Sequence, residues 1–133
     1  MIHKLEREAT AQIVIRQLPR LWNSLNHLII QLKDTSRNYT TTELIELRYG
    51  FMNNYTIMNS FNTNHGVWFS SRYPEFAIAL SEAISSVQNI NNTVTNGLQA
   101  NYWDAELDKP VVADISQNHR NVLATSIEAE LES

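Results

Sequence analysis

The four histidines are the residues best suited by type to acid–base catalysis or to binding a metal ion. Helical bundles that hold two metal ions use the spacing Glu-X-X-His twice, because it directs both side chains to one face of a helix. Glutamate is absent from these positions: the residues three before His27, His65 and His119 are Ser24, Asn62 and Ser116, and nothing stands three before His3. The chain also has no cysteine and no glycine-rich phosphate loop. The sequence therefore predicts no metal, no cofactor and no catalytic residue.

His65 stands in a polar stretch beside Trp68 and Phe69. One interpretation makes it a general base at the mouth of a pocket. The other makes it an ordinary loop histidine, and we favour this second reading because no carboxylate lies near it in the sequence. A small ligand-binding or enzymatic bundle that uses His65 and the aromatic cluster is accordingly the third of our hypotheses for function.

Most aromatic residues of the chain lie between Tyr49 and Phe76. Aromatic side chains usually fill a core, here one between two helices. Trp and Tyr are also enriched among the anchors of protein interfaces, so a recognition surface is the alternative. The candidates for that surface are Tyr55, Phe61, Trp68, Phe69 and Tyr73.

Arg16, Arg20 and His27 share the polar side of the first expected helix. The formal net charge of −4 argues against nucleic acid as a partner. Charge is unevenly divided, however, with a net +3 over residues 1–72 and −7 over residues 73–133. The basic face is therefore either a solvated face or a docking site for the acidic C-terminal segment.

Helices must position these residues, and the first is expected from Leu5 to Lys33. Its apolar residues recur at alternating intervals of three and four, which is the seam of a helix packed along its length. Pro19 interrupts the helix, but the apolar phase continues unchanged on both sides. We therefore expect a kink there more than two separate helices. The seam consists of Ala11, Val14, Leu18, Leu21, Leu25, Leu28 and Leu32.

A second helix is expected to begin after Thr40 and to end near Asn59. Thr40 and Glu43 fit a capping box, in which each residue accepts a hydrogen bond from the backbone of the other. Residues 62–66 read as a loop, and Pro74 suits the first turn of a third helix. Poor helix propensity over residues 89–97 makes a break near Asn91 and Asn92 an open possibility.

Residues 104–112 read as a linker, and Asp114 as the cap of a short fourth helix. The fold class is thus all-α, a bundle of three long helices with a short C-terminal helix that is either docked or detachable. Residues 1–103 form the bundle core, and residues 104–133 form the linker and C-terminal helix. We expect Ile127 and Leu131 to dock this helix on the basic face of the first helix, in its own chain or in a neighbour's, with Glu128 setting its orientation.

Two long segments carry no charge, one between Arg48 and Arg72 and one between Glu82 and Asp104. Both contain too many Asn and Gln residues to span a membrane. Uncharged polar residues are easier to desolvate than ions, and interface cores are depleted in charge. These segments, with Asn92 and Asn96 as candidates, therefore predict intermolecular contacts. The alternative is a monomer whose source favours Asn codons.

Self-association is the leading hypothesis for function. It describes a non-enzymatic structural or assembly protein whose partners are itself and other assembly proteins, with a virion or phage component as one setting. The alternative is a small helical module that inhibits or regulates a partner protein. The charged N-terminal residues do not resemble a signal peptide, so the expected location is the cytoplasm or a virion.

Overall fold

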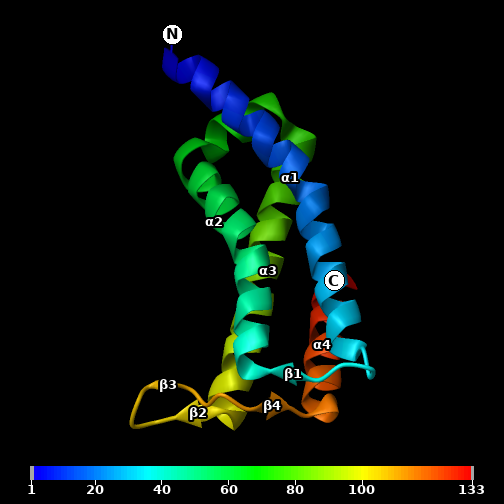
Figure 1. Ribbon diagram of the computed structural model, residues 1–133. Coiled ribbons are helices and arrows are strands. Elements are labelled where there is room, and N and C mark those ends of the chain that lie inside the picture. The colour runs from blue at the N-terminus through cyan, green and yellow to red at the C-terminus, as the bar shows by residue number, and fades with distance from the viewer. Residues whose placement is uncertain (1, 133) are drawn as a thin grey trace.

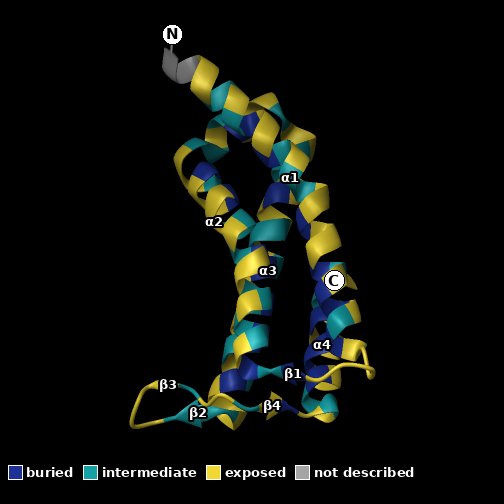
Figure 2. Ribbon diagram, in the orientation of Figure 1, coloured by how far each residue is buried: buried dark blue, intermediate teal, exposed yellow. Residues whose placement is uncertain are grey.

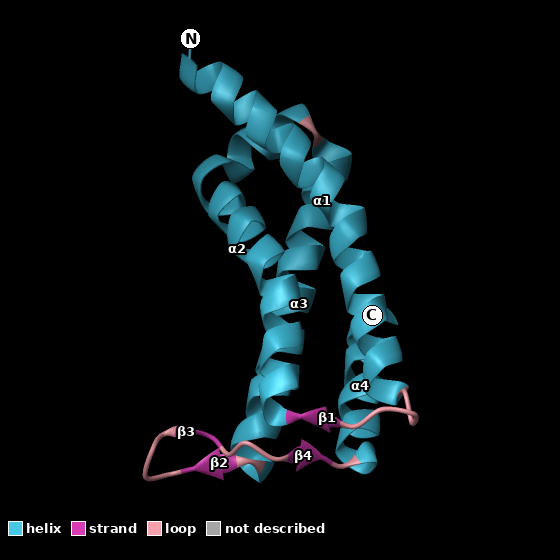
Figure 3. Cartoon of the chain, in the orientation of Figure 1, coloured by secondary structure: helices cyan, strands magenta, loops and turns pink. Residues whose placement is uncertain are grey.

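Four helices make up most of residues 2–132, the part of the chain that the computed structural model describes; side chains are described from residue 5. The predicted all-α class is confirmed, with three long helices and a short C-terminal one packed as an elongated bundle (Figure 1). The helices are α1 (Ile2–Lys33), α2 (Thr41–Arg72), α3 (Pro74–Asn101) and α4 (Gln117–Glu132). The same residues contain four short strands near one end of the bundle, β1 (Tyr39–Thr40), β2 (Trp103–Asp104), β3 (Lys109–Pro110) and β4 (Asp114–Ile115) (Figure 3).

The core follows the apolar seams of the helices. α1 packs against α2 and α4, and α3 packs against the same two helices from the other side. The seam predicted for α1 is buried except at Leu18, which is half-buried against the core (Figure 2). Burial of these stripes, more than helix propensity, therefore holds the bundle together.

Pro19 lies inside α1, and the helix continues through it as one element. The axis of α1 changes direction near its middle (Figure 1). Proline removes one helical hydrogen bond and pushes on the preceding turn, which is the usual cause of such a bend. The structure therefore agrees with the kinked single helix, not with two helices in line.

α2 is longer than the sequence predicted. The loop expected over residues 62–66 is wrong, because the helix runs on through it to Arg72. Met58, Phe61 and Phe69 are buried along this stretch and continue the apolar stripe of the helix. Their packing outweighs the weak local preference of Asn and Gly for a helix.

α3 begins one residue after α2 ends, with Pro74 in its first turn as predicted. The Tyr73 amide donates to the Phe69 carbonyl at 2.7 Å, which closes the turn. No break occurs at residues 91–92. Ile90 and Val94 on either side are buried, so tertiary packing holds the Asn-rich half of α3 in helical form.

The segment between α3 and α4 is tied to the start of α2. β2 and β3 form a small hairpin, and β1 pairs antiparallel with β4, placing Tyr39 opposite Ile115. Buried Thr41 donates its hydroxyl proton to the Val111 carbonyl at 2.6 Å, and its amide donates to the Ala113 carbonyl at 2.9 Å. The boundary expected at residue 104 thus falls in a segment that is hydrogen-bonded to the bundle.

α4 starts later than expected. Asp114 lies in β4, so the capping box predicted from Asp114 is wrong. Ser116 takes the role instead, and its hydroxyl oxygen accepts a hydrogen bond from the His119 amide at 3.2 Å. The pairing of β4 with β1 fixes Asp114 in extended form, which moves the first turn of the helix two residues along.

None of the helices in the described part of the chain is both long enough and apolar enough to cross a membrane.

The docking of α4 can be tested by truncating Ile127, which is fully buried, to alanine. Removal of a buried Ile side chain costs about 2–5 kcal/mol, so the urea midpoint and melting temperature should fall clearly. Val122 on the same helix is 56% exposed, and Val122→Ala should change the free energy of unfolding by less than about 0.5 kcal/mol. Equal effects of the two substitutions would show that α4 is not docked in solution.

Candidate interaction surface

The aromatic cluster is divided between the core and one end of the bundle. Phe61 and Phe69 are buried and pack edge to face with ring centroids 5.2 Å apart. These two residues are therefore core residues and cannot serve as surface anchors. Tyr55, Trp68 and Tyr73 are half-buried and pack against the core.

Trp68 and Tyr73 hold the beginning of α1 on the turn between α2 and α3. The Arg7 guanidinium lies over the Trp68 ring at 4.1 Å from its centroid. The Tyr73 hydroxyl donates to Glu8 Oε1 at 2.5 Å and accepts a hydrogen bond from Gln12 at 3.0 Å. The contact with the Glu8 carboxylate raises the pKa of Tyr73, because it stabilises the protonated phenol. These two aromatics thus have contacts within their own chain.

His65 lies on α2, not in a loop. Its ring is 5.5 Å from the ring of Phe61, in a shallow depression that Arg7, Asn62 and Trp68 also line. Among the described residues, no carboxylate pairs with it. A general base needs a partner that orients it, so the geometry gives no support to the enzymatic hypothesis.

The C-terminal helix docks in its own chain, but not on the face that the sequence suggested. Ile127 is buried, Leu131 packs against the core, and Glu128 forms an ion pair with Lys33 at the end of α1. The apolar stripes of α1 and α4 fix the register, and at that register Lys33 is the cation within reach.

Arg16, Arg20 and His27 remain exposed. Arg16 donates to the Gln12 carbonyl in its own helix at 3.3 Å. The expected docking of the C-terminal helix on this basic face is therefore wrong within one chain, while docking on the basic face of a neighbouring copy stays a prediction. The three residues form a solvated face, because they point away from the apolar seam that carries the packing.

A network around Arg120 was not found by sequence reasoning. Arg120 is only 2% exposed and donates to the Asp34 carbonyl at 3.0 Å and to the side chain of Gln117. Its guanidinium and that of Arg37 lie over the Tyr39 ring, at 5.2 and 4.7 Å from the centroid. Buried arginine normally needs such partners. The network therefore joins the end of α1, β1 and α4.

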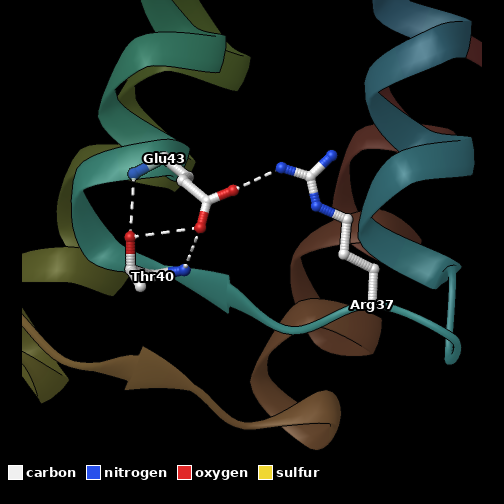
Figure 4. A network of polar contacts seen from close by, with 3 residues as sticks. All are labelled: Arg37, Thr40 and Glu43. Atoms are coloured by element: carbon white, nitrogen blue, oxygen red, sulfur yellow. Dashed lines mark hydrogen bonds and ion pairs between the residues drawn. The ribbon is translucent and has the colours of Figure 1, made fainter.

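The two acidic residues beside this network have separate partners. The Glu43 carboxylate accepts hydrogen bonds from the Thr40 amide and the Arg37 guanidinium. The Glu43 amide in turn donates to the Thr40 hydroxyl oxygen at 3.2 Å (Figure 4). The predicted capping box is therefore confirmed. Hydrogen bonds from the hydroxyl and amide of Ser36 lower the pKa of Asp34, and the charge of Arg120 adds to the effect.

A second polar contact lies at the start of α4. The Tyr102 hydroxyl accepts a hydrogen bond from the Ser116 amide at 3.3 Å and shares one of 2.7 Å with His119 Nδ1. An apolar cavity of about 70 Å³ lies beside the pair. It is too small for more than a very small ligand.

The outer faces of α2 and α3 are uncharged over several turns. Asn92 and Asn96 are exposed, as an interaction surface requires. We call the exposed stripe of α2 the α2 face and that of α3 the α3 face. The α2 face consists of Tyr49, Asn53, Ile57, Ser60, Asn64 and Val67, and the α3 face of Ser85, Gln88, Asn92, Asn96 and Gln99.

A groove opens between α1 and α3 where α4 ends. Its volume is about 330 Å³, and Leu131 of α4 lines one end of it. Trp22 on its edge is 49% exposed. Sequence reasoning did not find this groove, because it depends on how far α4 reaches along its two neighbours.

The remaining chemistry of the surface is limited. No group of three or more His, Asp or Glu residues able to hold a metal ion occurs in the part of the chain that is described. Comparison of the chain with protein-family models, with curated proteins and with solved structures found no match. A proposal for function therefore has to rest on the α2 face, the α3 face and the groove.

The contact between Glu8 and Tyr73 gives a pH test. Because the pKa of Tyr73 is higher in the folded protein than its ordinary value of 10.0, the contact stabilises the fold at pH values below 10.0. This stabilisation is lost as the pH rises through the folded-state pKa of Tyr73. Glu8→Ala should therefore lower the pKa of Tyr73 in a spectroscopic phenol titration, with Tyr73→Phe identifying the signal. Glu46→Ala, at an exposed position of α2, is the control. An unchanged titration in Glu8→Ala would show that the contact does not form.

Proposed function

We propose that the protein acts by self-association, as a non-enzymatic structural component of a larger assembly. The observation that carries the proposal is the uncharged outer surface made by the α2 face and the α3 face. In a monomer, the exposed side of a helix normally carries Lys and Glu. Here neither face carries a charged residue.

The chemistry of the α2 face and the α3 face suits a contact between proteins. Asn, Ser, Thr and Gln lose less free energy than ions when water is removed, and they can hydrogen-bond across a contact. Exposed Tyr49, Ile57 and Val67 add apolar area to the α2 face. Interface cores combine these features, namely little charge with scattered large apolar and aromatic side chains.

The partners that this proposal implies are other copies of the chain and further assembly proteins. The cytoplasm or a virion is the setting we propose, and the virion rests only on the small size of the chain and its lack of catalytic motifs. The acidic net charge argues against nucleic acid as the partner.

Charge placed on the two faces tests the proposal. Asn92→Lys combined with Asn96→Lys puts ions on the α3 face, and Ser60→Lys puts one on the α2 face. An unpaired ion buried in a contact costs about 3 kcal/mol, which weakens self-association by about a hundredfold. The mass measured by light scattering should therefore fall when the substituted face lies in the contact, while the helical circular dichroism stays unchanged.

The matched control is Asn23→Lys, which adds the same charge at an exposed position beside the basic residues of α1. Its mass should equal that of the wild type. A wild-type protein that stays monomeric at high concentration would contradict the proposal. So would a full oligomer mass in both the α3-face variant and the α2-face variant.

A further inference from the structure

The groove between α1 and α3 is the continuation of the space that α4 occupies. α4 lies between α1 and α3 and packs on both. It has 16 residues, whereas α1 has 32 and α3 has 28. A helix rises about 1.5 Å per residue, so α4 reaches along only about half of its neighbours. Beyond Leu131 the space is open, and core side chains of both helices line it.

The same face of α3 serves both halves of this space. Residues Ala79, Ala83, Ser86, Ile90, Thr93 and Gly97 recur at intervals of four and three, which places them on one side of the helix. Against α4, a Cβ on Gly97 would lie 3.3 Å from Leu123 Cδ2, so the two helices approach closely. Ala79, Ala83 and Ser86 line the groove with side chains that are also small. The α3 wall of the groove therefore resembles the part of α3 on which α4 packs.

The lining of the groove selects an uncharged helix. Apart from Glu82 and Ser86, its lining residues are apolar. A helix face with several charges would lose its hydration against this lining, where exposed Glu82 is the one charged residue, among those described, able to pair with a cation. The outer face of α1, which carries Arg16 and Arg20, does not meet this condition.

The α2 face meets the condition and also supplies an apolar side chain. Asn53, Ile57 and Ser60 are exposed at intervals of four and three, so they project together. Ile57 is 43% exposed. An apolar cavity of about 150 Å³ can hold a benzene ring, so the groove has room for Ile57 and its small neighbours. The α3 face has no large apolar residue to offer.

We propose that the α2 face of one copy of the chain docks in the groove between α1 and α3 of the next copy, centred on Ile57. This inference rests on the proposed function, because it names the two surfaces that meet during self-association. The donor and the acceptor are different surfaces of one chain. Each added copy therefore leaves a free groove at one end and a free α2 face at the other, which produces a ring or an open filament.

The test uses two variants at exposed positions. Ala79→Lys blocks the groove and leaves the α2 face intact, and Ile57→Lys blocks the α2 face and leaves the groove intact. Each variant alone should be monomeric by light scattering. An equimolar mixture should form a dimer of twice the 15.3 kDa chain mass and stop there, because the complex has one blocked groove and one blocked face.

Ser81→Lys is the control, since Ser81 is exposed on α3 but does not line the groove. It should assemble like the wild type. Circular dichroism checks that each variant is folded, and Trp22→Glu provides a second groove variant if Ala79→Lys is not. Wild-type mass in both groove variants would overturn the inference.

The outcomes separate this inference from the proposed function. In one outcome, the wild-type protein associates while the mixture of the two variants stays monomeric. That result overturns the head-to-tail contact alone and points to a symmetric contact between two copies. A wild-type protein that never associates overturns both, and leaves the groove to a helix of a different protein.

Discussion

The organisation of the molecule depends on a mismatch of helix lengths around one shared space. α1 and α3 face each other across it, and α4 seals only the half nearest the strands. In that half Leu123, Ala124 and Ile127 of α4 are buried. In the other half the same seams continue without a fourth helix, and α2 and the first turns of α1 close the end of the bundle. The protein is thus a four-helix bundle at one end and a three-helix bundle at the other.

The sealed half needs a polar network to keep α4 in place. Arg120 reaches from α4 to the end of α1, while its guanidinium lies over Tyr39 in β1. Removing such a cation from water is costly unless its partners are fixed, so the network favours one position of α4 over neighbouring ones. The pairing of β1 with β4 adds a second constraint in the same place. The position of α4 along α1, and hence the place where Leu131 meets the groove, follows from these contacts.

Local chemistry was sufficient to predict the parts of the fold that depend on neighbours in sequence. The seam of α1, the capping box of Thr40 and Glu43 and the start of α3 at Pro74 are of this kind. The continuation of α2 through residues 62–66 depends on Phe61 and Phe69 reaching a core that the local sequence does not reveal. The Arg120 network and the groove join residues far apart in the chain, so no spacing rule could have found them. The uncharged faces were visible in the sequence, but the groove was not.

The turn at Tyr73 bears on the order in which the chain folds. It joins α2 and α3 with a single residue between them, so their pairing closes the shortest loop in the bundle. α4 must instead find α1 across a separation of 85 residues, measured from Gln117 to Leu32. Contacts of such separation carry a larger loop-closure entropy cost, and native-state hydrogen exchange shows which unit of a fold opens first. We expect α4 to be that unit, and each opening would extend the groove along the full length of α1 and α3.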